Sequence, residues 1–363
     1  MAEDPPLSGL RVLDLSTLLP GPLASLILSD AGADVVKIER PGQGDEMRSY
    51  VPKLGDASAN YAVLNRGKRC VVADLKDPSD RAAVLDIAAE SDVVIEQFRP
   101  GVVARLGLSY ADVSERNPGV VYCSISGYGQ HGPHAARAGH DLNYLAQSGL
   151  LSVTCDDAGK PQLPHSVLAD ISGGTYPAVV NILLALRQRD RTGCGCQLDI
   201  SMTHNLQVLG YGYFASYLGG AGWPRPGGEL LTGASPRYRI YPTADGRHLA
   251  VAALEEKFWR RFADLIGLAP ELVHDVGQEA AVMSAVTELL AARTASEWST
   301  TFADEDVCTC VVATFDEAVR NGWVDVDSPH RLVGDGFDVG ALPSPVVDGL
   351  RRPPGGLGYP KLA

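Results

Sequence analysis

The sequence predicts an α/β protein, in which a parallel sheet wrapped by helices is followed by a smaller α+β domain. Over residues 8–130, short runs typical of buried strands alternate with stretches of helical periodicity, as in successive βαβ units. After residue 236, a strand–turn–strand hairpin with Asp245-Gly246 at its turn precedes two or three amphipathic helices. These two patterns predict two domains with different sheets.

The elements of the first domain follow one another in a regular order. The run RVLDLS predicts a buried strand, which passes through the Pro-Gly-Pro turn at 20–22 into an apolar helix ending at Gly32. The strand DVVKIER closes this first βαβ unit. Later helices are predicted over DPSDRAAVLDIAAES, after Gly101, from His140 onward and over PAVVNILLALRQR. The remaining predicted strands are CVVADL, DVVIEQF, GVVYCSIS and CQLDISM.

We place the domain boundaries where the composition changes. Residues 217–236 are rich in glycine and proline and predict a linker. The large domain then covers residues 1–216, completed by 330–363, and the small α+β domain covers 237–329. A chain of 363 residues, 45% of them hydrophobic, is long enough to build two cores.

Charge and composition exclude several classes of function. A net charge of -13 argues against broad binding to nucleic acid or to an anionic membrane. We find neither a signal peptide nor about 18 consecutive uncharged apolar residues, and so expect a cytoplasmic protein without a membrane span. The seven cysteines lack companions at metal-ligand spacing, so we expect free thiols and no metal site.

The first strand–helix turn also excludes a dinucleotide cofactor. It reads STLLPGPLAS and lacks the G-x-G-x-x-G pattern. Pro20 and Pro22 remove two backbone N–H donors where a phosphate would need them.

Three residues are candidates for chemistry. His140 begins a predicted helix after the small-residue stretch GPHAARAG, which makes it either a general acid–base or a structural cap. Asp170 is followed closely by a Gly-Gly pair and a long helix, and read alone it is more typical of a helix cap. Glu255 opens the helix after the strand HLAVAAL, where an acidic residue is common.

Basic residues collect at the predicted ligand edge of the sheet. Arg40, Lys76 and Arg99 come at or just past strand ends, with Arg105 on the following helix. Several cations at this edge suit a phosphorylated ligand, although surface cations paired with neighbouring acids give the same pattern. A further basic cluster lies in LNRGKRC, with the residues Arg66, Lys68 and Arg69.

With these residues in view, the sequence resembles the family III CoA-transferase (CaiB/BaiF) superfamily and, within it, the α-methylacyl-CoA racemase branch. The resemblance runs through nearly the whole chain and is specific in combination. It is carried by PLSGLRVLDLSTLLPGP, GADVVKIERPG, LNRGKR, ADLKDP, SDVVIEQFRPGV, RLGL, SGYGQHGP, AGHDLNY, LADISGG and ADGRHLAVAALEEKF.

The resemblance implies a Rossmann-like large domain and an interlocked homodimer, whose site lies between the large domain of one subunit and the small domain of the other. It implies that His140 and Asp170 are the acid–base pair and that Glu255 supports His140. The residues that it implies for contact with CoA and substrate are Arg40, Ala73, Asp74, Leu75, Lys76, Gln97, Phe98, Arg99, Arg105, Gly139, Asp141, Leu142, Asn143 and Tyr144.

The implied activity is interconversion of (R)- and (S)-2-methylacyl-CoA thioesters through an enolate. It needs no cofactor, because coenzyme A is part of the substrate. Two alternatives remain open: a CoA-transferase with Asp170 as its nucleophile, and a CoA-binding regulatory protein with a degenerate site. The acyl chain is not identified, and Arg237, His131 and His134 are departures from the racemase pattern that could mark a different acyl group.

Overall fold

The computed structural model describes residues 4–54, 57–156, 158–324, 331–333, 336–338, 344–347 and 350–351. Two compact units share the chain: Met1–Ser148 and Pro164–Leu209 in the larger, Gly149–Leu163 and Gly210–Val324 in the smaller. The change of unit thus falls before the glycine-rich stretch 217–236 that we predicted as a linker. The predicted return of residues 330–363 to the large domain lies mostly outside the described residues.

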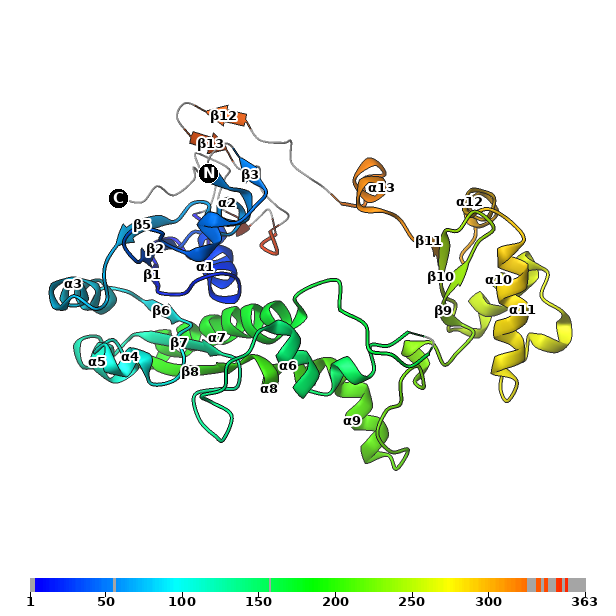
Figure 1. Cartoon of the computed structure of the whole chain (residues 1–363), viewed down its shortest axis with the longest axis horizontal. Helices are drawn as coiled ribbons and strands as arrows, with labels where there is room; N and C mark the ends of the chain where they lie inside the picture. Colours follow the sequence, from blue (N-terminus) through cyan, green and yellow to red (C-terminus); the bar gives the residue numbers. More distant parts are fainter. Residues whose placement is uncertain are drawn as a thin grey trace. The chain divides into compact units, whose positions relative to one another are not determined.

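The larger unit is built on a six-stranded, wholly parallel sheet, which confirms the predicted fold class. Its strand order is β5-β2-β1-β6-β7-β8, so the direction of winding reverses between β1 and β6 (Figure 1). In sheets of this kind, ligands bind beyond the carboxyl ends of the strands at the reversal point. The strands are β1 (Arg11–Asp14), β2 (Asp34–Glu39), β5 (Arg69–Val72), β6 (Val93–Glu96), β7 (Val121–Ser126) and β8 (Cys196–Ser201).

Helices cover both faces of this sheet. On one face, Val84 of α3 and Val113 of α5 pack with Leu13, Val94 and Tyr122 of the strands in a buried core. Helix α1 packs against α7, which in turn contacts β7 and β8. The helices are α1 (Pro20–Asp30), α2 (Ala59–Asn65), α3 (Pro78–Ala89), α4 (Val102–Arg105), α5 (Tyr110–Arg116), α6 (Asp141–Gln147), α7 (Tyr176–Thr192) and α8 (Met202–Asn205).

The smaller unit contains the predicted hairpin within a three-stranded antiparallel sheet. Its core is aromatic, with Trp259, Phe262 and Trp298 all buried. The elements are α9 (Tyr211–Leu218), β9 (Tyr238–Pro242), β10 (His248–Ala252), α10 (Glu256–Ile266), α11 (Glu279–Ala291), α12 (Ala295–Phe302), β11 (Thr309–Val311) and α13 (Phe315–Arg320). The remaining described strands form two short two-stranded sheets. One pairs β3 (Lys53–Leu54) with β4 (Ala57–Ser58), and the other pairs β12 (Arg331–Val333) with β13 (Gly336–Asp338).

Among the described residues, one helix is long and apolar enough to cross a membrane, judged by its length and composition alone. It runs over Ala169–Thr192, with a mean hydropathy of 1.2 in its most apolar window, and half of that window is buried inside the protein. A core helix has the same properties, so length and hydropathy are weak evidence for a span here.

Buried charges join β1 to β2 next to the reversal point. Asp14 and Lys37 lie opposite each other in the strand register, and both side chains are fully buried. The Lys37 ammonium lies 3.2 Å from the Asp45 carboxylate and donates to the carbonyl oxygen of Ser16 at 2.6 Å. The Lys68 ammonium lies 3.3 Å from the Asp14 carboxylate. Burial alone would lower the pKa of Lys37, but the carboxylates of Asp14, Asp45 and Glu39 raise it above its ordinary value.

We expect the substitution Lys37→Met to lower the free energy of unfolding by about 3–5 kcal/mol, because it leaves the buried carboxylates without their shared cation. Urea unfolding measures this loss. The control is Lys53→Met on the exposed strand β3, which should change stability by less than about 0.5 kcal/mol. Equal stability of the two variants would show that the buried network is energetically neutral.

Candidate active site

The loop that follows β1 forms the wall between two cavities at the reversal point. Leu18 in this loop has a φ of 63°, which is unusual for a residue with a side chain, and its N–H group donates to the carboxylate of Asp45. The Gly21 N–H group donates to the Gln97 side chain at 3.0 Å. A Cβ atom at Gly21 would lie 2.2 Å from the Ser16 hydroxyl, so only glycine fits here. The side chains of Gln97 and Ser16 therefore occupy the space beside Gly21 at the beginning of α1.

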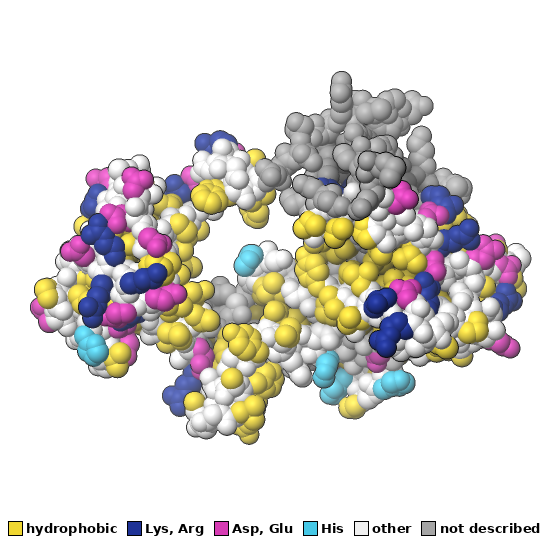
Figure 2. All heavy atoms as spheres, turned by 180° about the vertical axis from the view of Figure 1, so that it is seen from behind, with side chains coloured by type: hydrophobic (Ala, Val, Ile, Leu, Met, Phe, Trp, Pro, Cys, Tyr) yellow, Lys and Arg dark blue, Asp and Glu magenta, His cyan; other side chains and the backbone are white. Residues whose placement is uncertain are grey.

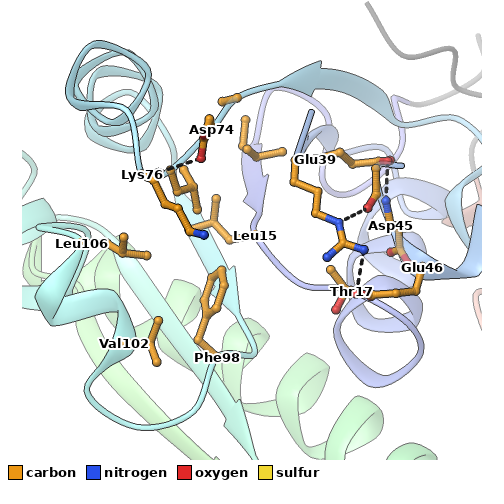
Figure 3. Close-up of a pocket in the computed structure, with 15 residues that line it drawn as sticks. Leu15, Thr17, Glu39, Asp45, Glu46, Asp74, Lys76, Phe98, Val102 and Leu106 are labelled. Atoms are coloured by element: carbon orange, nitrogen blue, oxygen red, sulfur yellow. Dashed lines mark hydrogen bonds and ion pairs between the residues drawn. The ribbon is translucent and has the colours of Figure 1, made fainter. Parts of the chain in front are cut away.

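The first cavity, here called the apolar cavity, has a volume of about 420 Å³ (Figure 3). Lys76 and Phe98 enter it from one side, while Glu39, Asp45 and Glu46 lie on the other. The Arg40 guanidinium contacts the Glu46 carboxylate at 3.0 Å, and both are about half exposed. Its lining residues are Leu15, Thr17, Ile38, Glu39, Arg40, Gly44, Asp45, Glu46, Ala73, Asp74, Leu75, Lys76, Phe98, Val102 and Leu106.

The second cavity, here called the polar cavity, also has a volume of about 420 Å³ and contains both His140 and Asp170. Phe98 lines this cavity as well as the apolar one, so a single side chain borders both. Its lining residues are Leu18, Pro20, Gln97, Phe98, Arg99, Pro100, Ile125, Ser126, Gly127, Ala135, Arg137, Ala138, Gly139, His140, Asn143, Tyr144, Asp170 and Met202.

His140 precedes the first residue of α6 and is exposed. Its backbone N–H group donates to the Asn143 side chain at 3.0 Å, and its carbonyl accepts from the Asn143 N–H group at 2.8 Å. These two bonds fix the backbone at the beginning of the helix, where His140 lines the polar cavity. The position therefore suits a group that exchanges protons with a bound ligand.

Asp170 lies in a π-helical turn, Ala169–Thr175, that leads into α7. Such turns are rare and are often found at functional sites. The backbone N–H groups of Ala169 and Asp170 both donate to Oδ1 of Asp141, at 2.6 and 3.0 Å. Asp141 directly follows His140 in the chain, so its carboxylate ties the Asp170 turn to the helix that carries His140.

Two effects raise the pKa of Asp170 to about 7: burial, which is the larger, and the negative charge of Asp141. The raised pKa places the titration of Asp170 near neutral pH, where a carboxyl group can both accept and return a proton.

Tyr144 packs α6 against the loop that follows β7. Its hydroxyl donates to the carbonyl oxygen of Gly139 at 2.5 Å, and its ring meets Tyr128 edge to face at 5.3 Å. A Cβ atom at Gly127 would lie 2.4 Å from the Tyr144 ring, and one at Gly139 would lie 2.6 Å from it. These glycines let the ring lie directly on the backbone that carries His140.

The Asp170 turn also depends on a close backbone contact. A Cβ atom at Gly173 would lie 2.4 Å from the carbonyl oxygen of Met202. We expect Gly173→Ala to lower the free energy of unfolding by about 1–3 kcal/mol and to reduce turnover, because the turn must move away from α8. Thermal unfolding and a turnover assay measure both effects. Gly212→Ala, in a helix with open space around it, is the matched control and should be neutral or slightly stabilising.

The other predicted site residues are partly brought together. Arg40, Ala73, Asp74, Leu75, Lys76 and Phe98 line the apolar cavity, and Gln97, Phe98, Arg99, Gly139, Asn143 and Tyr144 line the polar one. Arg105 lies on α4 between Val102 and Leu106, which line the apolar cavity, but it does not line that cavity itself. Leu142 lines neither cavity. Glu255 lies in the smaller unit, just before α10, and its support of His140 stays a prediction.

The cations of the basic cluster LNRGKRC are paired with acidic residues, as in the alternative given for the basic residues of the sequence. Arg66 pairs with Asp30 at 2.8 Å, Lys68 with Asp14 and Arg69 with Asp34, because neighbouring acids bind these cations within the fold. Arg237 is likewise bound, by Asp275 at 2.6 Å and by Glu256 at 2.9 Å, inside the smaller unit.

Several residues of the polar cavity were missed in the sequence. Arg137 lies three residues before His140 in the stretch ARAGHD, and Ser126 ends β7, where functional side chains of a parallel sheet are common. Within the described part of the chain, no group of three or more His, Cys, Asp or Glu side chains is placed to hold a metal ion. The seven cysteines are free.

The chain is similar in sequence and in fold to proteins of known family. A family model described as CoA-transferase family III matches residues 7–338. The alpha-methylacyl-CoA racemase of Homo sapiens is 35% identical over 94% of this chain and 86% of its own. The succinate–glutarate CoA-transferase of Agrobacterium fabrum is 37% identical over 73% of this chain and 67% of its own. A CAIB/BAIF family protein from Brucella suis has a crystal structure that matches with a TM-score of 0.78, at 28% identity, over 96% of this chain and 97% of its own.

Proposed function

We propose, since this chain belongs to CoA-transferase family III, that it is the racemase type of family member and interconverts the two epimers of a 2-methylacyl-CoA thioester. The observation that carries this proposal is the presence of His140 and Asp170 in one cavity of the larger unit. A racemase needs two proton carriers that can act on one carbon atom, and a transferase needs only a nucleophile.

The two cavities suggest how the thioester is held. We propose that coenzyme A occupies the apolar cavity, where the exposed cations Arg40 and Lys76 contact its phosphates. Its thiol arm then passes Phe98, which borders both cavities, and brings the thioester into the polar cavity. No cofactor besides the coenzyme A of the substrate enters the proposal.

The proton transfers follow from the chemistry of the two side chains. In one direction His140 removes the α-proton, the thioester carbonyl becomes an enolate, and protonated Asp170 returns a proton to the opposite face. In the other direction the two residues exchange roles. The N–H groups of residues 139–144 at the beginning of α6 are the proposed donors to the enolate oxygen. Glu255 is proposed to orient His140.

We also propose that the active form is a homodimer in the cytoplasm. Four large side chains on α7 are between 42 and 62% exposed, namely Tyr176, Val180, Leu183 and Leu184. Figure 2 shows hydrophobic side chains gathered on one face of the larger unit. Exposed apolar surface of this kind is typical of a protein–protein interface, which supports burial of α7 by a second copy of the chain.

The second candidate is a CoA-transferase, and the relatives favour it as strongly as the racemase, because both activities occur among proteins about 35–37% identical to this chain. One experiment separates them. The protein is incubated in deuterium oxide with one epimer of a 2-methylacyl-CoA and a free carboxylic acid. The proposal expects α-deuterium in the thioester and no new acyl-CoA. A new acyl-CoA without α-deuterium would establish the transferase instead.

A further inference from the structure

Arg137 is an unpaired cation inside the polar cavity. It lies on the segment between β7 and α6, three residues before His140, and lines the same cavity as His140 and Asp170. Its side chain is exposed, and its guanidinium makes no hydrogen bond or ion pair with any of the described residues. Arg40 in the apolar cavity differs, because Glu46 binds it at 3.0 Å.

The other groups around the polar cavity leave this charge uncompensated. Asp170 is the only carboxylate among its described lining residues, whereas Arg99 adds a second cation. The hydroxyl of Ser126, a residue that is only 7% exposed, also lacks a hydrogen-bond partner within the described part of the chain. A purely hydrocarbon acyl group would desolvate these polar groups without replacing their hydrogen bonds, which is unfavourable.

The apolar cavity has the opposite character. Leu15, Ile38, Leu75, Val102 and Leu106 are among its lining residues. Four carboxylates also line it, those of Glu39, Asp45, Glu46 and Asp74. The apolar cavity thus has four carboxylates against the two cations Arg40 and Lys76, whereas the polar cavity has two cations against the single carboxylate of Asp170.

We propose that the acyl group of the substrate carries a second, free carboxylate and that Arg137 binds it. This inference rests on the proposed function, since it places the acyl group in the polar cavity. A guanidinium binds a carboxylate with two parallel hydrogen bonds and holds its orientation as well as its charge. Arg99 keeps its proposed contact with coenzyme A and adds to the positive potential. Arg137 is thus a specificity residue that selects dicarboxylic over simple branched acyl groups.

The test compares matched pairs of thioesters by isothermal calorimetry. The charged ligands are the CoA monothioesters of 2-methylsuccinate, 2-methylglutarate and 2-methyladipate, and each has an uncharged partner with isopropyl in place of the free carboxylate. We expect at least one charged ligand to bind at least roughly tenfold more tightly than its uncharged partner, because a hydrogen bond between charged groups contributes enough binding free energy for such a difference. In the variant Arg137→Gln this preference should disappear. Arg116→Gln, which removes an exposed cation paired with Asp86 outside both cavities, should retain it.

Two results would overturn the inference. One is a protein that prefers none of the three charged ligands. The other is an equal loss of affinity for charged and uncharged ligands in Arg137→Gln, which would assign Arg137 to a phosphate of coenzyme A. The α-deuterium exchange of the same ligands is measured separately. A charge preference without exchange would support the carboxylate site and contradict the racemase, and exchange without a charge preference would do the reverse.

Discussion

The substitution Asp170→Asn is expected to lower the rate of racemisation at least about 10³-fold in both directions, because an amide cannot carry the proton between the enolate and solvent. The measurement is the loss of optical rotation of a single 2-methylacyl-CoA epimer. The affinity for coenzyme A should change little, since the apolar cavity does not include this residue. A variant with near-normal turnover would exclude Asp170 from the chemistry.

Stability provides the control for this variant. Because burial raises the folded-state pKa of Asp170 above its ordinary value, the folded protein binds this proton more tightly than the unfolded chain does. The ionised carboxylate therefore opposes folding, so the stability falls as the pH rises from the ordinary carboxyl range to about 7 and stays lower above it. We expect Asp170→Asn to be at least as stable as the parent protein at pH 8, so its lost activity is not lost structure.

The raised pKa also predicts a pH dependence that the two directions share. The two epimers carry the same number of protons, so their equilibrium constant does not change with pH and the two values of kcat/KM must change in parallel. In both directions kcat/KM should fall about tenfold per pH unit above about 7, because the His140–Asp170 pair then loses the one proton that the exchange needs. Parallel falls for the two epimers, with this transition lost in Asp170→Asn, would support the assignment.

The substitution His140→Ala is expected to lower racemisation by about 10²–10⁴-fold, since it removes the proton carrier on the other face of the α-carbon. His140 lines the polar cavity, and its backbone bonds to Asn143 do not need the side chain, so the fold should persist. Rates for both epimers and circular dichroism of the variant measure the two effects.

His134→Ala is the matched control, because His134 lies on the same loop, is exposed and lines neither cavity. Its turnover should stay within about twofold of the parent protein. If His140→Ala and the parent protein transferred CoA to a free carboxylic acid equally well while Asp170→Asn did not, the transferase mechanism would account for the result, because that mechanism needs only the carboxylate.

The local sequence predicted the sheet well because its strands are short, apolar and separated by helices. All six predicted parallel strands, including RVLDLS and GVVYCSIS, are present. The burial of β6 and β7 on both faces explains the clear signal, since every residue in these strands is buried.

The site was harder to predict, because it depends on contacts between distant residues. Taken alone, Asp170 looked like a helix cap, but the cap is Asp141, which accepts the N–H groups of Ala169 and Asp170. The partners of the basic cluster LNRGKRC could not be predicted from the sequence, because Arg66 pairs with a residue 36 positions away. Local periodicity does not report such pairs. The motifs of the resemblance indicated His140 as a site residue. The cavity that His140 lines could be identified only from the structure, because its lining residues are distant in the sequence.

The central claim is that two residues act on opposite faces of one carbon atom, and the most direct measurement follows deuterium in each epimer separately. One epimer of the substrate is incubated in deuterium oxide, and both epimers are analysed by mass spectrometry during the first tenth of the reaction. The account predicts deuterium in nearly all of the newly formed epimer and in little of the remaining substrate, because the opposite face is reprotonated by a different group. Equal deuterium in both epimers, or deuterium in the remaining substrate alone, would contradict it.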